Sequence, residues 1–178
     1  VRPSHTYDAT LLPFHGGYTT LDRLRRGKPI LVHDDGQSLW TLTHHRDFAR
    51  AFVPLLGQPR AIGQAYHITS DEVLTWNEIA RLLAEAAGVT PDIAHVPSTV
   101  VAGYDPGWGD SLLGDKAHDT TFDNSKIRGL VPDFAAEIPF AEGAREIVAW
   151  YDAHPEARRV DAAHDALLDR IIGDQRAQ

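Results

Sequence analysis

Gly63-Gln-Ala-Tyr-His-Ile-Thr-Ser-Asp-Glu-Val-Leu-Thr-Trp-Asn-Glu-Ile-Ala-Arg-Leu-Leu-Ala-Glu-Ala-Ala-Gly88 is the stretch that decides the fold class. Its first part, residues 64–69, alternates apolar and polar side chains, which predicts a short strand. Thr75 and Glu78 then have the capping-box spacing, in which each side chain bonds the other residue's backbone amide. Apolar residues follow at helical spacing until Gly88, which predicts the end of the helix. A strand followed closely by a helix indicates a mixed α/β or α+β chain.

The same two patterns recur on both sides of this stretch. Further strands are predicted at residues 29–33, 39–42, 92–96 and 120–122. Further helices are predicted at residues 21–25, 46–56, 140–151 and 161–172. For the first of these helices, Thr19 or Thr20 is the expected N-cap. Residues 98–118 are mixed, with a turn-rich centre around Trp108.

Composition excludes several classes of function. The 178 residues carry a net charge of −8 and contain no cysteine, which excludes disulfides and thiolate chemistry. Nucleic acid is disfavoured as a partner, because binding to phosphates needs clustered positive charge. No apolar run approaches the ~20 residues that span a bilayer, and no signal peptide is present, so we expect a cytoplasmic protein without a membrane partner. The chain opens at Val1 without a methionine, and we therefore expect an upstream segment.

Several motifs are absent from the sequence. It has no Gly-x-Gly-x-x-Gly turn, no phosphate-binding Gly-x-x-x-x-Gly-Lys-Ser/Thr loop and no Gly-x-Ser-x-Gly elbow. The ten histidines include no His-x-His or His-x-x-x-His pair. We therefore predict no metal site, and expect the histidines to cap helices, lie on the surface or line a pocket.

Four segments, taken in order, resemble the extended short-chain dehydrogenases/reductases. Residues 2–8 resemble the family's Arg-Pro-x-x-x-Tyr-Gly-Pro segment, and residues 40–51 its Arg-Asp-Phe-x-x-Val-x-Asp-x-Ala-x-Ala block, with direct matches at Asp47 and Ala49. Residues 63–69 are similar to its Gly-x-x-Tyr-Asn-Ile-Gly strand, and residues 122–127 to its Asp-x-Ser-Lys element. The resemblance implies the C-terminal, substrate-binding portion of an NAD-dependent epimerase/dehydratase-like protein, with the Rossmann half absent. Residues 1–155 would form the substrate-binding domain fragment and residues 156–178 a C-terminal helical extension.

The resemblance also implies a reaction shared between two halves. NAD or NADP and a Tyr-x-x-x-Lys pair would belong to the absent Rossmann half, so no catalytic residue is expected here and the isolated chain should be inactive. The family's loop that passes the nicotinamide corresponds to Pro3, Ser4 and His5, which otherwise form a simple strand-exit turn. The expected partners are the chain's own Rossmann half, a small-molecule substrate and a second copy in a homodimer.

Two departures from the family pattern bear on the substrate. Trp40 and Leu112 occupy positions where nucleotide-sugar enzymes carry arginines that grip the diphosphate. Since neither can replace the fork of an arginine, a smaller hydroxyl or carbonyl compound fits better. Trp40 could stack on such a compound or be a core residue, and Trp108 could belong to a lid or to a fixed surface loop. The candidate substrate contacts are Tyr7, Trp40, His44, Trp108 and Lys116.

The alternative to an oxidoreductase is a non-catalytic member of the same family. Such a protein would act as a regulatory module or would bind RNA or another protein. The sequence upstream of Val1 would discriminate between these functions, because it would show whether the glycine-rich turn and the tyrosine-lysine pair are present.

Overall fold

The computed structural model describes residues 1–177 and consists of short strands and helices in alternation. The strands are β1 (Arg2–Pro3), β2 (His5–Tyr7), β3 (Ile30–His33), β4 (Leu39–Trp40), β5 (Leu42–His44), β6 (His67–Ile68), β7 (Leu74–Thr75) and β8 (Ile93–Val96). The α-helices are α1 (Tyr18–Arg25), α2 (His45–Leu55), α3 (Trp76–Ala86), α4 (Ser98–Tyr104), α5 (Pro106–Ser111), α6 (Ser125–Arg128), α7 (Phe140–Ala153) and α8 (Ala162–Arg176). Two short 3-10 turns, η1 (Pro59–Ala61) and η3 (Pro155–Ala157), and the π-helix η2 (Leu112–Lys116) complete the chain.

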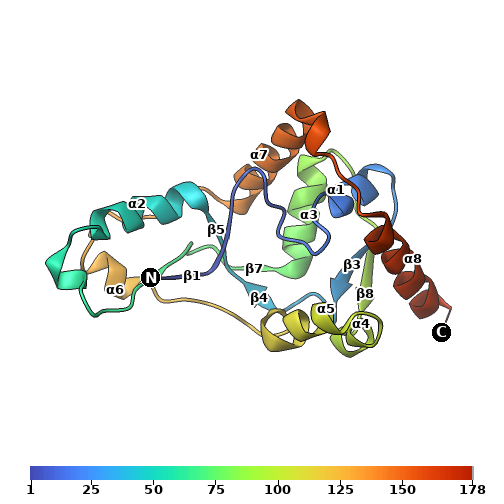
Figure 1. Cartoon of the computed structure of the whole chain (residues 1–178), viewed down its shortest axis with the longest axis horizontal. Coiled ribbons are helices and arrows are strands. Elements are labelled where there is room, and N and C mark those ends of the chain that lie inside the picture. The colour runs from blue at the N-terminus through green and yellow to red at the C-terminus, as the bar shows by residue number, and fades with distance from the viewer. Residues whose placement is uncertain (178) are drawn as a thin grey trace.

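The strands form four separate pairs, three of them parallel. β1 pairs with β6, β2 with β5 and β3 with β8, all in parallel, whereas β4 and β7 are antiparallel. The molecule is elongated (Figure 1): α2, α6 and β1 lie at one end, and β3 and β8 lie at the other among α1, α4, α5 and α8. This arrangement is the mixed α/β fold that the sequence predicts.

Three apolar clusters hold these elements together. The largest packs α3 and α7 against the central strands, with Trp40, Trp76 and Phe140 among its buried side chains. A second cluster packs β8 against α4, η2 and α8. Its buried side chains include Val96, Val101, Leu112, Leu168 and Ile171. The third packs α2 on β6 and α6 through Ala51, Leu55, Ile68, Ile127 and Phe134. The first two clusters surround the cavities described below.

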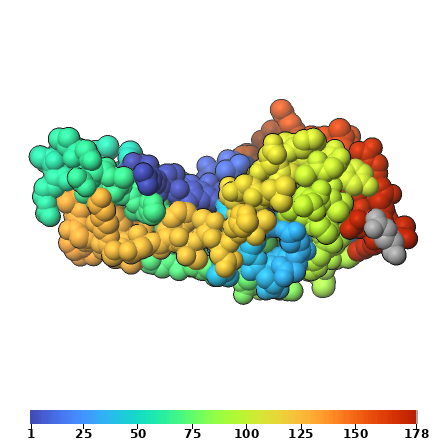
Figure 2. All heavy atoms as spheres, turned by 90° about the horizontal axis from the view of Figure 1, so that it is seen from below, coloured from blue at the N-terminus to red at the C-terminus, as the bar shows by residue number. Residues whose placement is uncertain are grey.

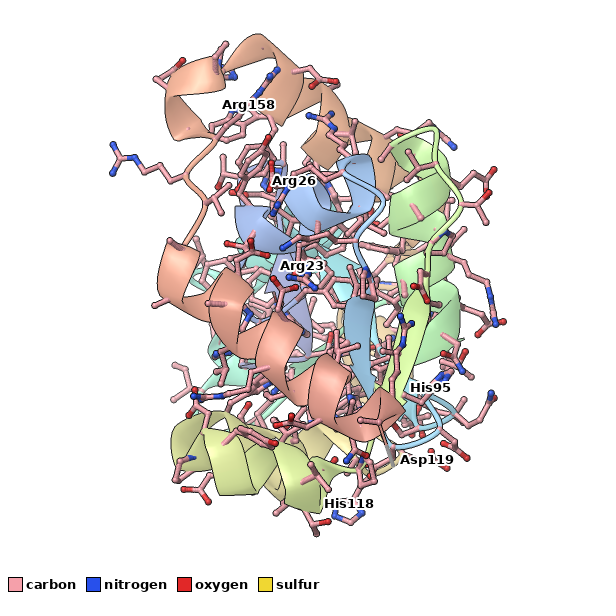
Figure 3. All side chains as sticks on the ribbon, turned by 90° about the vertical axis from the view of Figure 1, so that its right-hand side faces the viewer. Arg23, Arg26, His95, His118, Asp119 and Arg158 are labelled. Carbon is pink, nitrogen blue, oxygen red and sulfur yellow. The ribbon has the colours of Figure 1, made fainter. Side chains whose placement is uncertain are left out.

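The last helix belongs to the second of these clusters. α8 buries Leu168, Ile171 and Ile172 against the β3–β8 end of the molecule. The first two turns of α8 carry Asp165 and Asp169, and both carboxylates accept hydrogen bonds from Arg23 of α1. Arg23 is fully buried, and its Nε donates to the carbonyl of Pro29 at 2.9 Å. Figure 3 shows Arg23 between α1 and α8, so this arginine connects residues beyond 155 to the rest of the chain.

The capping box predicted for α3 is confirmed. Thr75 Oγ1 accepts from the Glu78 amide at 3.1 Å, and the Thr75 amide donates to Glu78 Oε2 at 2.7 Å. Gly88 follows the helix with a φ of 72°, a left-handed conformation that other residues adopt at a cost.

Two local predictions were wrong. α1 begins at Tyr18 after Gly17, without a side-chain cap, and Thr19 and Thr20 lie buried inside it. Thr19 Oγ1 instead accepts from the Asp161 amide at 3.0 Å, so packing against the segment before α8 displaced the cap. Residues 120–122 form no strand, because Thr120 makes only one backbone bond to Leu39, at 2.8 Å. No helix in the described part of the chain is long and apolar enough to cross a membrane.

Replacing Thr75 with alanine should lower the free energy of unfolding by about 1 kcal/mol, because the Glu78 amide at the start of α3 loses the hydroxyl that accepts its hydrogen bond. Chemical denaturation followed by far-UV circular dichroism would measure the loss. Thr90→Ala, in the exposed loop after α3, is the control and should leave stability unchanged. Equal stability of Thr75→Ala and the parent chain would contradict the role of the cap.

Candidate functional site

Two cavities meet at His5 and Lys116. The outer cavity has a volume of about 400 Å³ and is lined by Pro3, Ser4, His5, Trp40, Thr41, Asp115, Lys116, Thr120 and Phe122. The inner cavity, of about 190 Å³, shares His5 and Lys116 and extends to Phe14, His15, His33, Trp76, Trp108 and Leu112. Figure 2 shows the face along which the yellow-to-orange segment after α5 runs from the middle of the molecule to its left-hand end. Residues of this segment supply one wall of the outer cavity.

Trp40 organises the polar groups at the junction. Its Nε1 donates to His5 Nδ1 at 3.2 Å, and the two rings are perpendicular. Lys116 Nζ lies 5.5 Å from the centre of the Trp40 ring, within the range of a cation–π contact. Lys116 Nζ also donates to Ser111 Oγ and Asp115 Oδ1, both at 2.9 Å. Among residues 1–177, Lys116 is the only cation that lines both cavities, and its ammonium group is already paired with Asp115.

Burial keeps the histidines of the site neutral. It lowers the pKa of His5 to about 4, and the nearby charge of Lys116 adds to this effect. Burial likewise lowers the pKa of His15 and of His33. At pH 7 these rings are hydrogen-bonding groups without charge.

The inner cavity has an aromatic wall. His15 stacks on Trp108 with 4.7 Å between ring centres, and His164 of α8 meets both rings at an angle. His33 Nε2 lies 2.8 Å from the carbonyl oxygen of Lys116, which fixes the end of η2 beside the cavity. α8, β3 and η2 therefore hold this wall from three directions.

The structure brings most of the sequence-predicted site residues together. Pro3, Ser4, His5, Trp40 and Lys116 line the outer cavity, and Trp108 lines the inner one.

Tyr7 and His44 do not reach either cavity. Tyr7 is buried against His44 and Phe140, with its ring edge-on to both. His44 Nε2 lies 3.1 Å from Glu146 Oε2 of α7. The structure thus places these two predicted substrate contacts in the packing between β2, β5 and α7.

Sequence reasoning missed His15, His33 and Trp76 as cavity residues. One signal was available for His33, which ends the predicted strand at residues 29–33. Ligands of α/β proteins commonly bind beyond the carboxyl ends of parallel strands. His15 and Trp76 carry no such signal, since the first lies in a glycine-containing loop and the second reads as the first turn of a capped helix.

The described residues contain no cluster of metal ligands, and the predicted cofactor contacts lie at one edge of the outer cavity. No group of three His, Asp or Glu side chains within residues 1–177 is arranged to hold a metal ion. Of the predicted cofactor contacts, the Ser4 hydroxyl is engaged with Thr43 Oγ1 at 2.6 Å. Pro3, Ser4 and His5 form only one edge of a cavity, and no glycine-rich turn accompanies them.

Curated relatives of known name match parts of the chain. A chloroplast stem-loop binding protein of Arabidopsis thaliana is 34% identical over 74 residues, 41% of this chain and 20% of that protein. A 2'-dehydrokanamycin reductase of Streptomyces kanamyceticus is 33% identical over 72 residues, 40% of this chain and 20% of the reductase. A dTDP-glucose 4,6-dehydratase of Streptomyces niveus is 29% identical over 150 residues, 83% of this chain and 38% of the dehydratase. No family model matches the sequence.

Solved structures show the same fold. A dTDP-glucose 4,6-dehydratase from Bacillus anthracis in complex with NAD superposes on 88% of this chain and 44% of its own, with a TM-score of 0.63 and 21% identity. A UDP-glucuronic acid 4-epimerase from Bacillus cereus in complex with NAD superposes on 91% of this chain and 45% of its own, with a TM-score of 0.62 and 17% identity. The chain thus spans less than half the length of the relatives and structures it matches.

The fold and the cavities define a partial α/β domain of the epimerase/dehydratase type. The chain is similar in sequence to part of a reductase and part of a dehydratase, and its fold matches less than half of NAD-complexed epimerases and dehydratases.

Proposed function

We propose that this chain is the substrate-binding part of an NAD(P)-dependent epimerase/dehydratase-like oxidoreductase that acts on a small hydroxyl or carbonyl compound. The observation that carries the proposal is the composition of the two joined cavities. Their walls combine aromatic rings, neutral histidines and a single lysine, and among residues 1–177 no arginine lines either cavity. Such a lining suits an uncharged ligand held by a few hydrogen bonds.

A nucleotide diphosphate would be poorly bound in this site. A diphosphate group is held best by planar guanidinium groups that bond two oxygens at once. Trp40 and Leu112, where the family pattern has arginines, are both buried and both line the cavities. Lys116 offers one point charge, which Asp115 already neutralises.

We propose further that NAD(P) and the catalytic pair belong to a nucleotide-binding half, so the chain alone is inactive. The exposed surface at the α2 end of the molecule supports the presence of such a partner. Val53, Leu56 and Ile62 are 60%, 64% and 80% exposed there, and within the described chain β1 pairs with β6 alone. Parallel strands are normally covered on both faces, so this end suits a larger sheet. A second copy that covered the same surface would instead give the expected homodimer.

Tryptophan fluorescence would test the choice of ligand, because Trp40, Trp76 and Trp108 line the cavities. We expect a saturable change with a nucleotide-free hydroxyketone such as dihydroxyacetone, or a cyclic polyol such as myo-inositol. We expect none with UDP-glucose or NAD⁺ at the same concentrations. Trp108→Phe should reduce the signal, whereas Trp150→Phe, which lies outside both cavities, should retain it. Saturable binding of UDP-glucose or NAD⁺ to this chain would contradict the proposal.

The relative from Arabidopsis supports a second candidate, a non-catalytic RNA-binding module. The net charge of −8 opposes it, because RNA affinity depends on positive charge. A mobility shift with a stem-loop RNA at physiological salt would decide between the two candidates. We expect no shift, and a specific complex would favour the RNA-binding module.

A further inference from the structure

The hydrogen bond between Trp40 and His5 determines the tautomer of the histidine. An indole N–H can only donate, and it points at His5 Nδ1 from 3.2 Å. Nδ1 must therefore be the nitrogen without a proton. A neutral imidazole carries one proton, so that proton is on Nε2. The indole thus fixes which edge of the His5 ring is the donor.

The Nε2 edge of His5 is the free edge. Within residues 1–177, Nε2 has no hydrogen-bond partner, and it is not among the polar atoms sealed inside the protein. His5 is half-buried and lines both cavities, so the accessible part of its ring faces them. A ligand at the junction would meet an N–H group.

The surroundings of His5 keep the ring uncharged. Its pKa is lowered to about 4, mainly by burial and also by the charge of Lys116, against a smaller opposing effect of Asp115. Since the folded-state pKa lies far below pH 7, His5 stays a neutral donor through the physiological range. Trp40 and His5 together therefore present an oriented hydrogen-bond donor without a charge, whereas an arginine in the place of Trp40 would bring a positive charge.

We infer that His5 is a positioning residue whose Nε2–H donates to an uncharged hydroxyl or carbonyl oxygen of the ligand, and that Trp40 determines this specificity by holding Nδ1. The inference rests on the proposed function, because it assigns a contact within the same site. Removing the donor with His5→Phe should weaken binding of a neutral ligand by about 10-fold.

Nitrogen NMR of the chain labelled with ¹⁵N would test the tautomer without any ligand. His5 is assigned as the imidazole signal that His5→Asn removes. We expect a pyridine-like Nδ1 and a pyrrole-like Nε2, unchanged between pH 8 and about pH 5.5. Trp40→Phe, which keeps the aromatic bulk but loses the N–H, should give a mixture of tautomers. Trp76→Phe is the matched control, since Trp76 lines the inner cavity without bonding His5, and should leave the pattern intact.

A titration of the same sample with dihydroxyacetone and with UDP-glucose separates this inference from the proposed function. We expect dihydroxyacetone to shift the Nε2–H signal and UDP-glucose to leave it unchanged. An Nδ1–H tautomer, a protonated ring at pH 7, or dihydroxyacetone binding that leaves the Nε2–H signal in place would overturn the role of His5 alone. Binding of UDP-glucose at His5 would overturn both the inference and the proposed function.

Discussion

Replacing Arg23 with methionine is expected to lower the free energy of unfolding by about 3–5 kcal/mol. The Arg23 side chain is fully buried and bonds Asp165, Asp169 and the Pro29 carbonyl. Methionine fills much of the space but removes the donor to the Pro29 carbonyl and to one oxygen of each carboxylate, while Arg26 and Lys28 still bond the other carboxylate oxygens. The docking of α8 on α1 should weaken first, because the arginine lies between them. Urea denaturation would measure the loss, and limited proteolysis would show whether α8 is released.

Arg26→Met is the matched control for Arg23→Met. Arg26 is the C-cap residue of the same helix and also bonds Asp165, but its side chain is 40% exposed. A surface ion pair contributes little, so we expect a change below about 1 kcal/mol. Similar losses for the two variants would show that burial of Arg23 is not the source of its effect.

The ion pairs of Asp165 also predict how the stability of the chain changes at acid pH. Burial alone would raise the pKa of Asp165, but hydrogen bonds from Arg23 and Arg26 outweigh it and hold the pKa at about 2. A carboxyl with a lowered folded-state pKa stabilises the fold above its ordinary value of about 4 and loses that contribution as the pH falls toward 2. Arg23→Met should therefore flatten the stability profile between these two pH values.

Replacing Gly143 with alanine is expected to destabilise the chain by about 2–3 kcal/mol, because the helix α7 packs directly on Tyr7. A Cβ at position 143 would lie 2.7 Å from Tyr7 Cζ and still closer to the hydroxyl oxygen. Tyr7 is buried and cannot swing away without disturbing its contacts with His44 and Phe140. Thermal unfolding of the variant and the parent chain would measure the difference.

Two further variants make the Gly143 test specific. Gly173→Ala in α8 has open space around the new methyl group and should be neutral or slightly stabilising. Tyr7→Phe removes a hydroxyl that is buried without a partner in the part of the chain that the structure describes. It should cost little alone and should partly rescue Gly143→Ala. Absence of any rescue would show that the hydroxyl is not the obstacle.

The elements predicted best from the sequence are those whose signals are local. The capping box of α3 depends on four consecutive residues, Thr75 to Glu78, and the structure confirms it. The cap of α1 was wrong because Thr19 is recruited by Asp161, which lies far along the chain. The π-helix at Leu112–Lys116 also had no readable signal, although it places Lys116 between the two cavities.

The site was predicted residue by residue but not as an arrangement. Resemblance to the family assigned His5 to the cofactor and Trp40 and Lys116 to the substrate, whereas the structure gathers all three at one junction. Tyr7 and His44 belong to segments that resemble the family and were predicted to contact the substrate, but neither lines a cavity. Their actual neighbours, Phe140 and Glu146, come from a helix that sequence patterns cannot place against them.

The pairing of the strands has a consequence for how fast the chain acquires its structure. Within the described residues, no strand pairs with the next strand in sequence: Arg2 lies beside His67, His5 beside Leu42 and Ile30 beside Ile93. Each pair must close a long loop before any of its contacts form, and such closure slows folding more than helix formation does. On a ribosome, β1 would have to wait for β6 to emerge, while α3 could form as soon as its own residues were made.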